Sequence, residues 1–263
     1  MPEKIKIYQI DAFTNKVYSG NPASVLIMKE WLDEELMQKI ADENNLAETA
    51  FVVKRDMDFE IRWFTPAVEV DLCGHATLAA AYVLFKYYSY EEDKITFYSR
   101  YSGELIVEKD GDKLTLDFPT DTISEVKTPQ KLVNAFGKTP NMTFKGKTDY
   151  LMVFSSQKQI ENLHPDFEEL ATIGGRGVIV TAPGEETDFV SRFFAPQVGI
   201  NEDPVTGSAH TTLIPYWSKT LNKKKLSARQ LSKRQGDLIC EDCGDRVKIT
   251  GNAVTYMIGE ILI

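Results

Sequence analysis

The segment at residues 201–210, NEDPVTGSAH, gathers two carboxylates, two hydroxyls, a glycine and a histidine. Asp203 precedes Pro204, and a residue before proline is biased toward an extended backbone, so Asp203 is expected just ahead of a helix that begins near Gly207. The first turn of a helix has unpaired amide hydrogens and a partial positive charge, so it can hold an anion. The segment therefore predicts an acid placed beside an anion-binding helix start.

A related segment lies in the first half of the chain. GHAT at residues 74–77 follows RWFTP, just as GSAH at residues 207–210 follows RFFAP, with RWFTP and RFFAP separated by 130 residues (192 − 62). Upstream, DEEL (residues 33–36) corresponds to FEEL (residues 167–170). We interpret this recurrence as an internal duplication. Two helix starts related in this way are expected to face each other across a domain cleft and bind one small anion.

The periodicity of apolar residues predicts an alternating order of strands and helices. In the first half we expect strands near residues 4–10, 23–28, 49–54, 59–64, 94–99, 103–109 and 113–118, and helices at 33–43 and 74–84. In the second half we expect strands near residues 149–154, 177–182 and 188–194, and helices near 165–173 and from 207. This order predicts two similar domains of mixed α and β structure, residues 1–120 and residues 121–263.

The helix from Gly74 contains alanines on all sides, which favours a helix enclosed by strands over one lying on a surface. The final segment, VTYMIGEILI, is typical of a strand. The sequence leaves open whether this strand stays with the second half or returns to the first.

Composition restricts the class of protein. The chain has 263 residues, a net charge of −9 and only three cysteines. The negative charge disfavours nucleic-acid binding, and an odd, small number of cysteines favours a reducing compartment, so we expect a cytoplasmic protein. The longest apolar run, ATLAAAYVLF, is too short to cross a bilayer, so we expect no membrane association.

Four segments in order carry a family resemblance: GNPASV (residues 20–25), NLAETAFV (45–52), RWFTPAVEVDLCGHATLAAA (62–81) and EDPVTGSAH (202–210). Together they resemble the phenazine-biosynthesis PhzF-like isomerases. The resemblance implies the α+β fold of diaminopimelate epimerase, with two pseudo-symmetric domains, each a mostly antiparallel sheet wrapped around a central helix. It also implies an active site between the domains, a homodimer, no cofactor and no metal.

The resemblance assigns the site residues. Glu48 matches the family glutamate that moves a proton along a dihydro-hydroxyanthranilate ring, and His75, Asp203 and Ser208 match the family's other polar site residues. The resemblance therefore implies an isomerase acting on a small carboxylated metabolite, with Glu48, His75 and Asp203 catalytic. The remaining residues, expected to hold the substrate, are Gly74, Ser208, Gly207, Thr206 and Asn21.

Each of these residues also has an ordinary structural explanation. Glu48 sits in an apolar segment and is either a functional buried acid or a strand-end residue facing solvent. His75 could bond a neighbouring loop, Asp203 could be a turn residue, and Thr206 and Ser208 could cap their helix. The sequence alone leaves these alternatives open.

Two other functions compete with a glutamate-dependent isomerase. One is a thiol-assisted epimerase that uses Glu48 with Cys73: epimerases of this fold use one thiol from each domain, and Cys73 precedes a helix start that would favour its thiolate. The matching second-half segment, NEDPVTGS, has no cysteine, so we interpret Cys73 as a packing residue near the site. The other competitor is a metabolite-binding protein without catalysis.

Two further motifs are assigned no chemistry. CEDC (residues 240–243) has too few partners for a structural zinc and is typical of a hairpin turn between GDLI and DRVKIT. GGRG (residues 174–177) precedes a strand and opens no helix, so it is not a dinucleotide-binding fingerprint.

Overall fold

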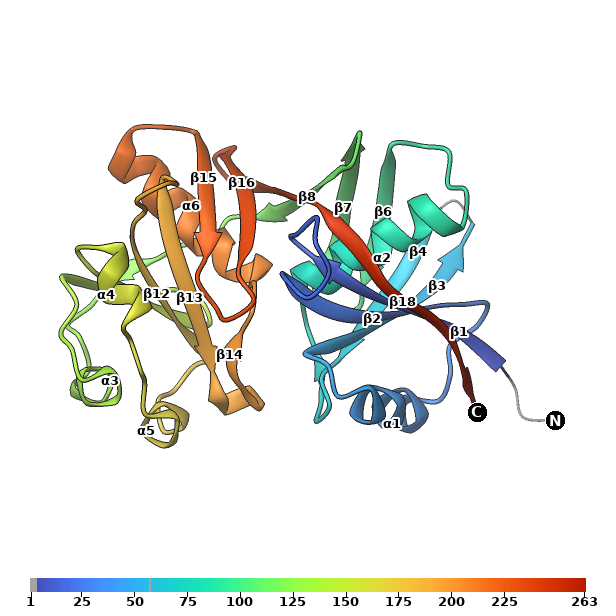
Figure 1. Cartoon of the computed structure of the whole chain (residues 1–263), viewed down its shortest axis with the longest axis horizontal. Helices are drawn as coiled ribbons and strands as arrows, with labels where there is room; N and C mark the ends of the chain where they lie inside the picture. The colour runs from blue at the N-terminus through green and yellow to red at the C-terminus, as the bar shows by residue number, and fades with distance from the viewer. Residues whose placement is uncertain (1–3, 57) are drawn as a thin grey trace. The chain divides into compact units, whose positions relative to one another are not determined.

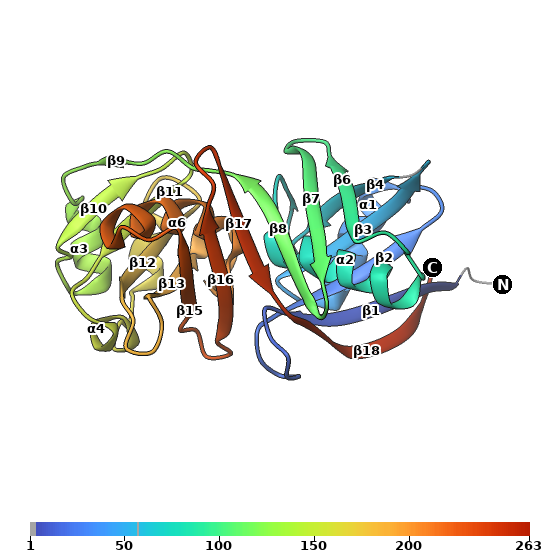
Figure 2. The same ribbon diagram turned by 90° about the horizontal axis from the view of Figure 1, so that it is seen from above.

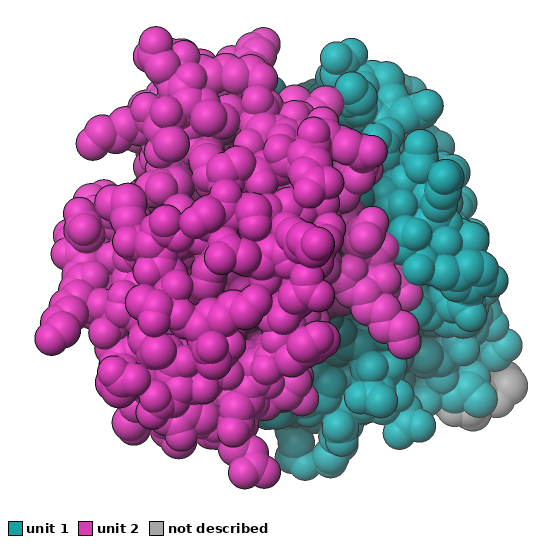
Figure 3. Space-filling model, turned by 60° about the vertical axis from the view of Figure 1, so that its left-hand side comes forward, with its two compact units in different colours: residues 1–118, 249–263 teal, residues 119–248 magenta. Residues whose placement is uncertain are grey.

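The computed structural model describes residues 4–56 and 58–263. The chain forms two compact units, here called unit 1 (residues 1–118 and 249–263) and unit 2 (residues 119–248) (Figures 1 and 3). The chain therefore passes from one unit to the other twice, after Phe118 and after Lys248. The first crossing lies close to the boundary expected near residue 120.

In the described residues, unit 1 is a mixed sheet with two helices. Its strands are β1 (Lys4–Ala12), β2 (Asn21–Met28), β3 (Glu48–Arg55), β4 (Asp58–Phe64), β5 (Glu69–Val70), β6 (Lys94–Ser99), β7 (Gly103–Asp110), β8 (Lys113–Pro119) and β18 (Ala253–Leu262). Neighbouring strands pair in the order β18, β1, β2, β3, β4, β6, β7 and β8. All of these pairs are antiparallel except β2–β3 and β4–β6, which are parallel.

Helix α2 (Gly74–Tyr87) is the centre of unit 1 and packs against β1, β2, β3, β7 and β18 (Figure 2). Every residue from Gly74 to Ala81 is buried, and its alanines allow strands to approach on several sides. The other helix, α1 (Glu34–Asn44), begins after Asp33, whose side chain accepts a hydrogen bond from the Glu35 amide. Its apolar side, with Met37 and Ile40, packs on a second core beside β2 and β3.

Unit 2 contains strands β9 (Ser124–Glu125), β10 (Met142–Lys145), β11 (Asp149–Val153), β12 (Gly177–Pro183), β13 (Phe189–Ala195), β14 (Ile200–Asp203), β15 (Lys225–Gln230), β16 (Gly236–Asp242) and the start of β17 (Arg246–Gly251). Its helices are α3 (Gln130–Phe136), α4 (Gln157–Glu161), α5 (Phe167–Ala171), the 3₁₀ turn η1 (Pro196–Val198) and α6 (Gly207–Leu221). The short helices α3, α4 and α5 contribute Leu132, Ile160 and Leu170 to a core with β12 and β13.

The two units repeat one pairing pattern. From β1 to β7 the successive pairs are antiparallel, parallel, antiparallel, parallel and antiparallel, and the same alternation runs from β10 through β11, β12, β13 and β15 to β16. In each unit a short strand (β5 or β14) pairs with the fourth strand and leads into the long helix (α2 or α6). The expected α+β fold, with mostly antiparallel sheets around central helices, is confirmed.

An arginine clamp recurs at the same point of each pattern. Arg62 on β4 bonds both oxygens of Glu69 on β5, with nitrogen–oxygen distances of 2.7 and 2.6 Å. Arg192 on β13 bonds both oxygens of Glu202 on β14 at 2.7 and 2.9 Å. Two-point pairs of this kind fix direction as well as distance. Each clamp therefore sets the course of the chain just before the long helix begins.

The final strand belongs to unit 1, which settles the question that the sequence left open. β18 pairs antiparallel with β1 along the length of both strands, with a register shift beside Gln9. Short elements of unit 2, such as α3, β10 and β14, were not predicted, because four to seven residues carry too little periodicity. The hairpin turn expected at CEDC lies further along the chain: Cys240–Asp242 end strand β16, and the turn begins at Cys243, whose amide donates to the Arg246 carbonyl.

None of the helices in the described part of the chain has the length and apolar character needed to cross a lipid bilayer.

Gly20 lies directly before the first residue of β2. We predict that Gly20→Ala destabilises unit 1 by at least about 2 kcal/mol. Gly20 has φ +64°, and an added Cβ would lie 2.1 Å from the Ala12 carbonyl oxygen. Gly111→Ala is the matched control, because Gly111 has φ +58° but no atom within 4 Å of the added Cβ. Urea unfolding measures both free energies, and equal losses would show that the close approach to Ala12 does not matter.

Candidate active site

Strand pairing in unit 1 brings Asn21, Glu48 and His75 together. β2 and β3 are parallel neighbours, and they begin at Asn21 and Glu48. Because parallel strands start at the same edge of a sheet, these two side chains come from one edge. Helix α2 begins at Gly74, so His75 lies in its first turn. We call Asn21, Glu48, Cys73, Gly74 and His75 the α2 group.

The ring of His75 contacts both polar partners. Its Nε2 lies 3.2 Å from Glu48 Oε2, and its Nδ1 lies 3.0 Å from Asn21 Nδ2. The first contact is close enough for a hydrogen bond but is not aligned as one, which is common at catalytic contacts before substrate binds. The Glu48 side chain is 12% exposed, so it does not face bulk solvent.

Burial keeps His75 neutral. Desolvation lowers the pKa of His75 to about 3, and a hydrogen bond with the backbone of Pro22 only partly opposes this shift. A neutral imidazole has one N–H donor and one acceptor nitrogen. At neutral pH the contact with Glu48 is therefore not an ion pair. According to its tautomer, the neutral ring can donate a hydrogen bond to a Glu48 carboxylate or accept one from a Glu48 carboxylic acid.

Cys73 precedes the helix and lies beside the same ring, with Sγ 3.5 Å from His75 Nδ1. Glu48, Cys73 and His75 offer ligand atoms within 4.8 Å of one another, so they are candidate ligands for a metal ion. However, the contacts of Cys73 and Glu48 are with opposite nitrogens of the imidazole. A metal ion binds one ring nitrogen, so these side chains would have to move to share an ion.

Unit 2 presents the equivalent helix start, formed by Asp203, Thr206, Gly207 and Ser208, here called the α6 group. Asp203 ends β14 and is 7% exposed. Its Oδ2 accepts a hydrogen bond from Thr206 Oγ1. Thr206 does not cap its own helix through its side chain. The amide hydrogens and partial positive charge of a helix start are features that can hold an anion.

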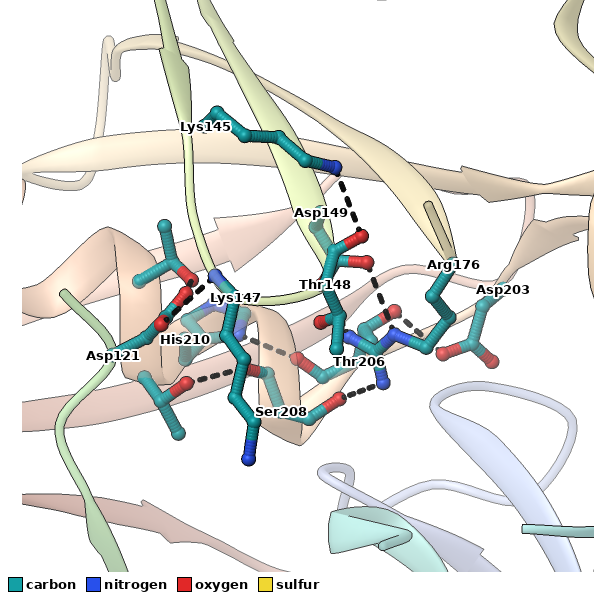
Figure 4. Close-up of polar contacts among 12 residues, drawn as sticks. Asp121, Lys145, Lys147, Thr148, Asp149, Arg176, Asp203, Thr206, Ser208 and His210 are labelled. Atoms are coloured by element: carbon teal, nitrogen blue, oxygen red, sulfur yellow. Dashed lines mark hydrogen bonds and ion pairs between the residues drawn. The ribbon is translucent and has the colours of Figure 1, made fainter. Parts of the chain in front are cut away.

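Two residues that sequence reasoning missed hold the α6 group in place. Gln230 on β15 is fully buried. Its Oε1 accepts a hydrogen bond from the Thr206 amide at 2.8 Å, and its Nε2 donates one to the Asp203 carbonyl at 2.7 Å. Arg176 NH1 donates to Ser208 Oγ at 2.8 Å (Figure 4). No local pattern points to Gln230, and the GGRG segment that contains Arg176 was considered only for nucleotide binding.

His210 occupies the place in α6 that Thr77 occupies in α2. The Thr77 hydroxyl donates to the Cys73 carbonyl, and His210 Nδ1 lies 2.8 Å from the Thr206 carbonyl oxygen. Because a carbonyl only accepts, Nδ1 carries the proton. Burial lowers the pKa of His210 to about 4. His210 therefore supports the loop before α6 as a neutral ring.

The family model described as phenazine biosynthesis-like protein matches residues 10–259. The chain belongs to the phenazine biosynthesis-like family. It is 50% identical to an uncharacterized isomerase of Pseudomonas aeruginosa over 258 residues, covering 98% of this chain and 99% of that protein.

Solved structures agree with this assignment. A crystal structure of a PhzF-family phenazine biosynthesis protein from Enterococcus faecalis has a TM-score of 0.95 and 46% identity, covering 99% of this chain and 100% of that one. A hydroxyproline epimerase from Agrobacterium vitis matches with a TM-score of 0.67 and 10% sequence identity. The match covers 100% of this chain and 94% of the epimerase chain, and it shows that the fold is shared. The expected PhzF-like isomerase is confirmed as the enzyme class.

The buried histidines predict a pH dependence of stability. In the unfolded chain a histidine has a pKa near 6.5, whereas the folded values for His75 and His210 are about 3 and about 4. As pH falls below about 6.5 the unfolded state takes up protons that the folded state does not. The free energy of unfolding is therefore highest above about pH 6.5. As pH falls below that value, it decreases by up to about 1.4 kcal/mol per pH unit for each histidine.

NMR of the imidazole C–H signals measures this directly. Both rings should stay neutral down to about pH 5 in the folded protein. Unfolding free energies of His75→Asn and of the parent at pH 7 and pH 5 give the second measurement, and the variant should lose less stability. Protonation of His75 near pH 6.5 in the folded protein would contradict the burial argument.

Proposed function

We propose that the enzyme moves a proton between two carbons of a small carboxylated metabolite, with Glu48 as the general acid and base. The observation that carries the proposal is the buried contact of Glu48 Oε2 with His75 Nε2, at 3.2 Å. A neutral imidazole can donate a hydrogen bond to the carboxylate that takes a proton and accept one from the acid that returns it, according to its tautomer.

The reaction follows from this arrangement. The Glu48 carboxylate takes a proton from a carbon next to the substrate carboxylate or a double bond, and the electron pair of that C–H bond moves into the conjugated system. The protonated Glu48 then delivers the proton to another carbon of the same system. His75 stays neutral and holds the Glu48 carboxyl, while Asn21 holds His75. No cofactor takes part.

We further propose that the α6 group binds the substrate carboxylate. Its support is a helix start without a side-chain cap, with the Ser208 hydroxyl and the Gly207 amide in its first turn. Asp203 assists proton transfer at a polar substituent of the substrate, and Thr206 orients Asp203. The matching positions of α2 and α6 in the repeated pattern support a duplicated ancestry.

A thiol-dependent epimerase is the second candidate. It is favoured by the contact of Cys73 with His75 and by the fold shared with the hydroxyproline epimerase. It is opposed by Thr206, which replaces a thiol at the equivalent place in unit 2. A binding protein without catalysis is disfavoured because relatives are named isomerases.

We predict that Glu48→Gln lowers turnover at least about 100-fold, because a positioned acid or base contributes about that much or more. The assay incubates the protein in heavy water with a panel that includes a dihydro-hydroxyanthranilate and trans-4-hydroxy-L-proline. Deuterium at carbon is measured by mass spectrometry. Glu43→Gln, an exposed acid on α1, is the matched control and should keep full activity.

The same assay separates the two mechanisms. The Cys73→Ala variant should retain activity if Glu48 is the acid and base. It should be inactive if the enzyme is a thiol-dependent epimerase. Full turnover by Glu48→Gln would remove Glu48 from the chemistry. Isotope exchange with hydroxyproline alone, lost in Cys73→Ala, would favour the epimerase.

We propose that the enzyme is a homodimer and that a second copy covers β18. Tyr256 and Ile258 on this strand are 48% and 46% exposed, and Tyr18, at 71%, packs against Tyr256. Light scattering should give twice the chain mass of 29.7 kDa. Tyr256→Lys with Ile258→Lys should give the monomer mass, because a charged strand disfavours self-association. A dimer that survives both substitutions would place the interface elsewhere.

A further inference from the structure

Arg176 is fixed in direction by a buried carboxylate. Its Nε lies 3.0 Å from Asp149 Oδ1, and its NH2 bonds Asp149 Oδ2. Asp149 begins β11 and is 3% exposed, and the guanidinium lies over the Phe193 ring at 5.1 Å. A two-point pair with a stacked face leaves the guanidinium little freedom to turn.

The remaining terminal nitrogen of Arg176 reaches the α6 group, where NH1 donates to Ser208 Oγ at 2.8 Å (Figure 4). A serine hydroxyl has one proton to donate and two lone pairs to accept with. Since the oxygen accepts from Arg176, the hydroxyl proton must point away from the guanidinium. Accepting a charge-assisted hydrogen bond also polarises the O–H bond, which strengthens it as a donor.

We propose that Arg176 is a positioning residue that directs the Ser208 hydroxyl proton toward the substrate carboxylate. The inference rests on the proposed role of the α6 group in binding that carboxylate. Asp149 balances the guanidinium charge, so Arg176 contributes direction and polarisation, whereas the α6 amides and the Ser208 hydroxyl contact the anion. The chemical class selected is a carboxylate whose oxygen accepts from Ser208.

Acetate is a suitable probe because it is the carboxylate group with a minimal substituent. Backbone amide shifts of Gly207 and Ser208, followed by ¹H–¹⁵N NMR during an acetate titration, give its dissociation constant. We expect Arg176→Gln to raise this constant about 10-fold, the size expected for loss of one polarised hydrogen bond to a charged group. Arg176→Lys should be as weak as Arg176→Gln, because lysine keeps the charge but not the fixed fork.

A double-variant cycle tests whether Arg176 acts through Ser208. Ser208→Ala should weaken acetate about as much, and adding Arg176→Gln to it should cause no further loss. Arg229→Gln is the matched control in the same unit, since Arg229 also pairs with carboxylates and is 32% exposed against 29% for Arg176. It should leave acetate binding unchanged.

Loss of Arg176 leaves Asp149 as an unbalanced buried charge that could destabilise unit 2. Asp149→Asn combined with Arg176→Gln removes that charge and should show the same weakened acetate binding. An unchanged dissociation constant in Arg176→Gln, full binding by Arg176→Lys, or additive losses with Ser208→Ala would each overturn the inference alone. No acetate-dependent shift in the parent protein would instead overturn the proposed carboxylate role of the α6 group.

Discussion

The burial of helix α2 is the constraint on which the site of unit 1 depends. Strands pack against α2 on several sides, and its first turn carries His75 into an environment that excludes water. A charged imidazolium is too costly there, so burial lowers the pKa of His75 to about 3 and leaves a neutral ring beside Glu48. If α2 lay on a surface, the ring would ionise near neutral pH and pair with Glu48 as a salt bridge. The alanines of α2 therefore matter to the protonation state of His75, because they let strands enclose the helix.

The repeated pattern places different side chains at equivalent positions of the two units. The clamps of Arg62 and Arg192 fix the chain before each long helix in the same way, so each unit presents a helix start at the same place. The side chains there differ: Cys73 and His75 stand before and in α2, whereas Thr206 and Ser208 hold these places at α6.

The two groups also differ in how their polar atoms are supported. In the α2 group a neutral imidazole contacts the Glu48 carboxyl. In the α6 group Gln230 and Arg176 hold loop and hydroxyl in fixed directions through several hydrogen bonds. Fixed dipoles suit a part that binds charge without changing protonation, since they need no reorganisation when the ligand changes. The charge of Arg176 is balanced by Asp149, so its contribution is directional.

The sequence by itself determined the α+β class, the two long helices with their enclosed first turns and, through its motifs, the family. These features are local, because apolar spacing and short motifs lie within a few residues of one another. Tertiary structure decided which unit receives β18, that Asn21 meets His75, and that Arg176 and Gln230 hold the α6 group. Those contacts join residues that are distant in the chain, and only the pairing of strands brings them within hydrogen-bond distance.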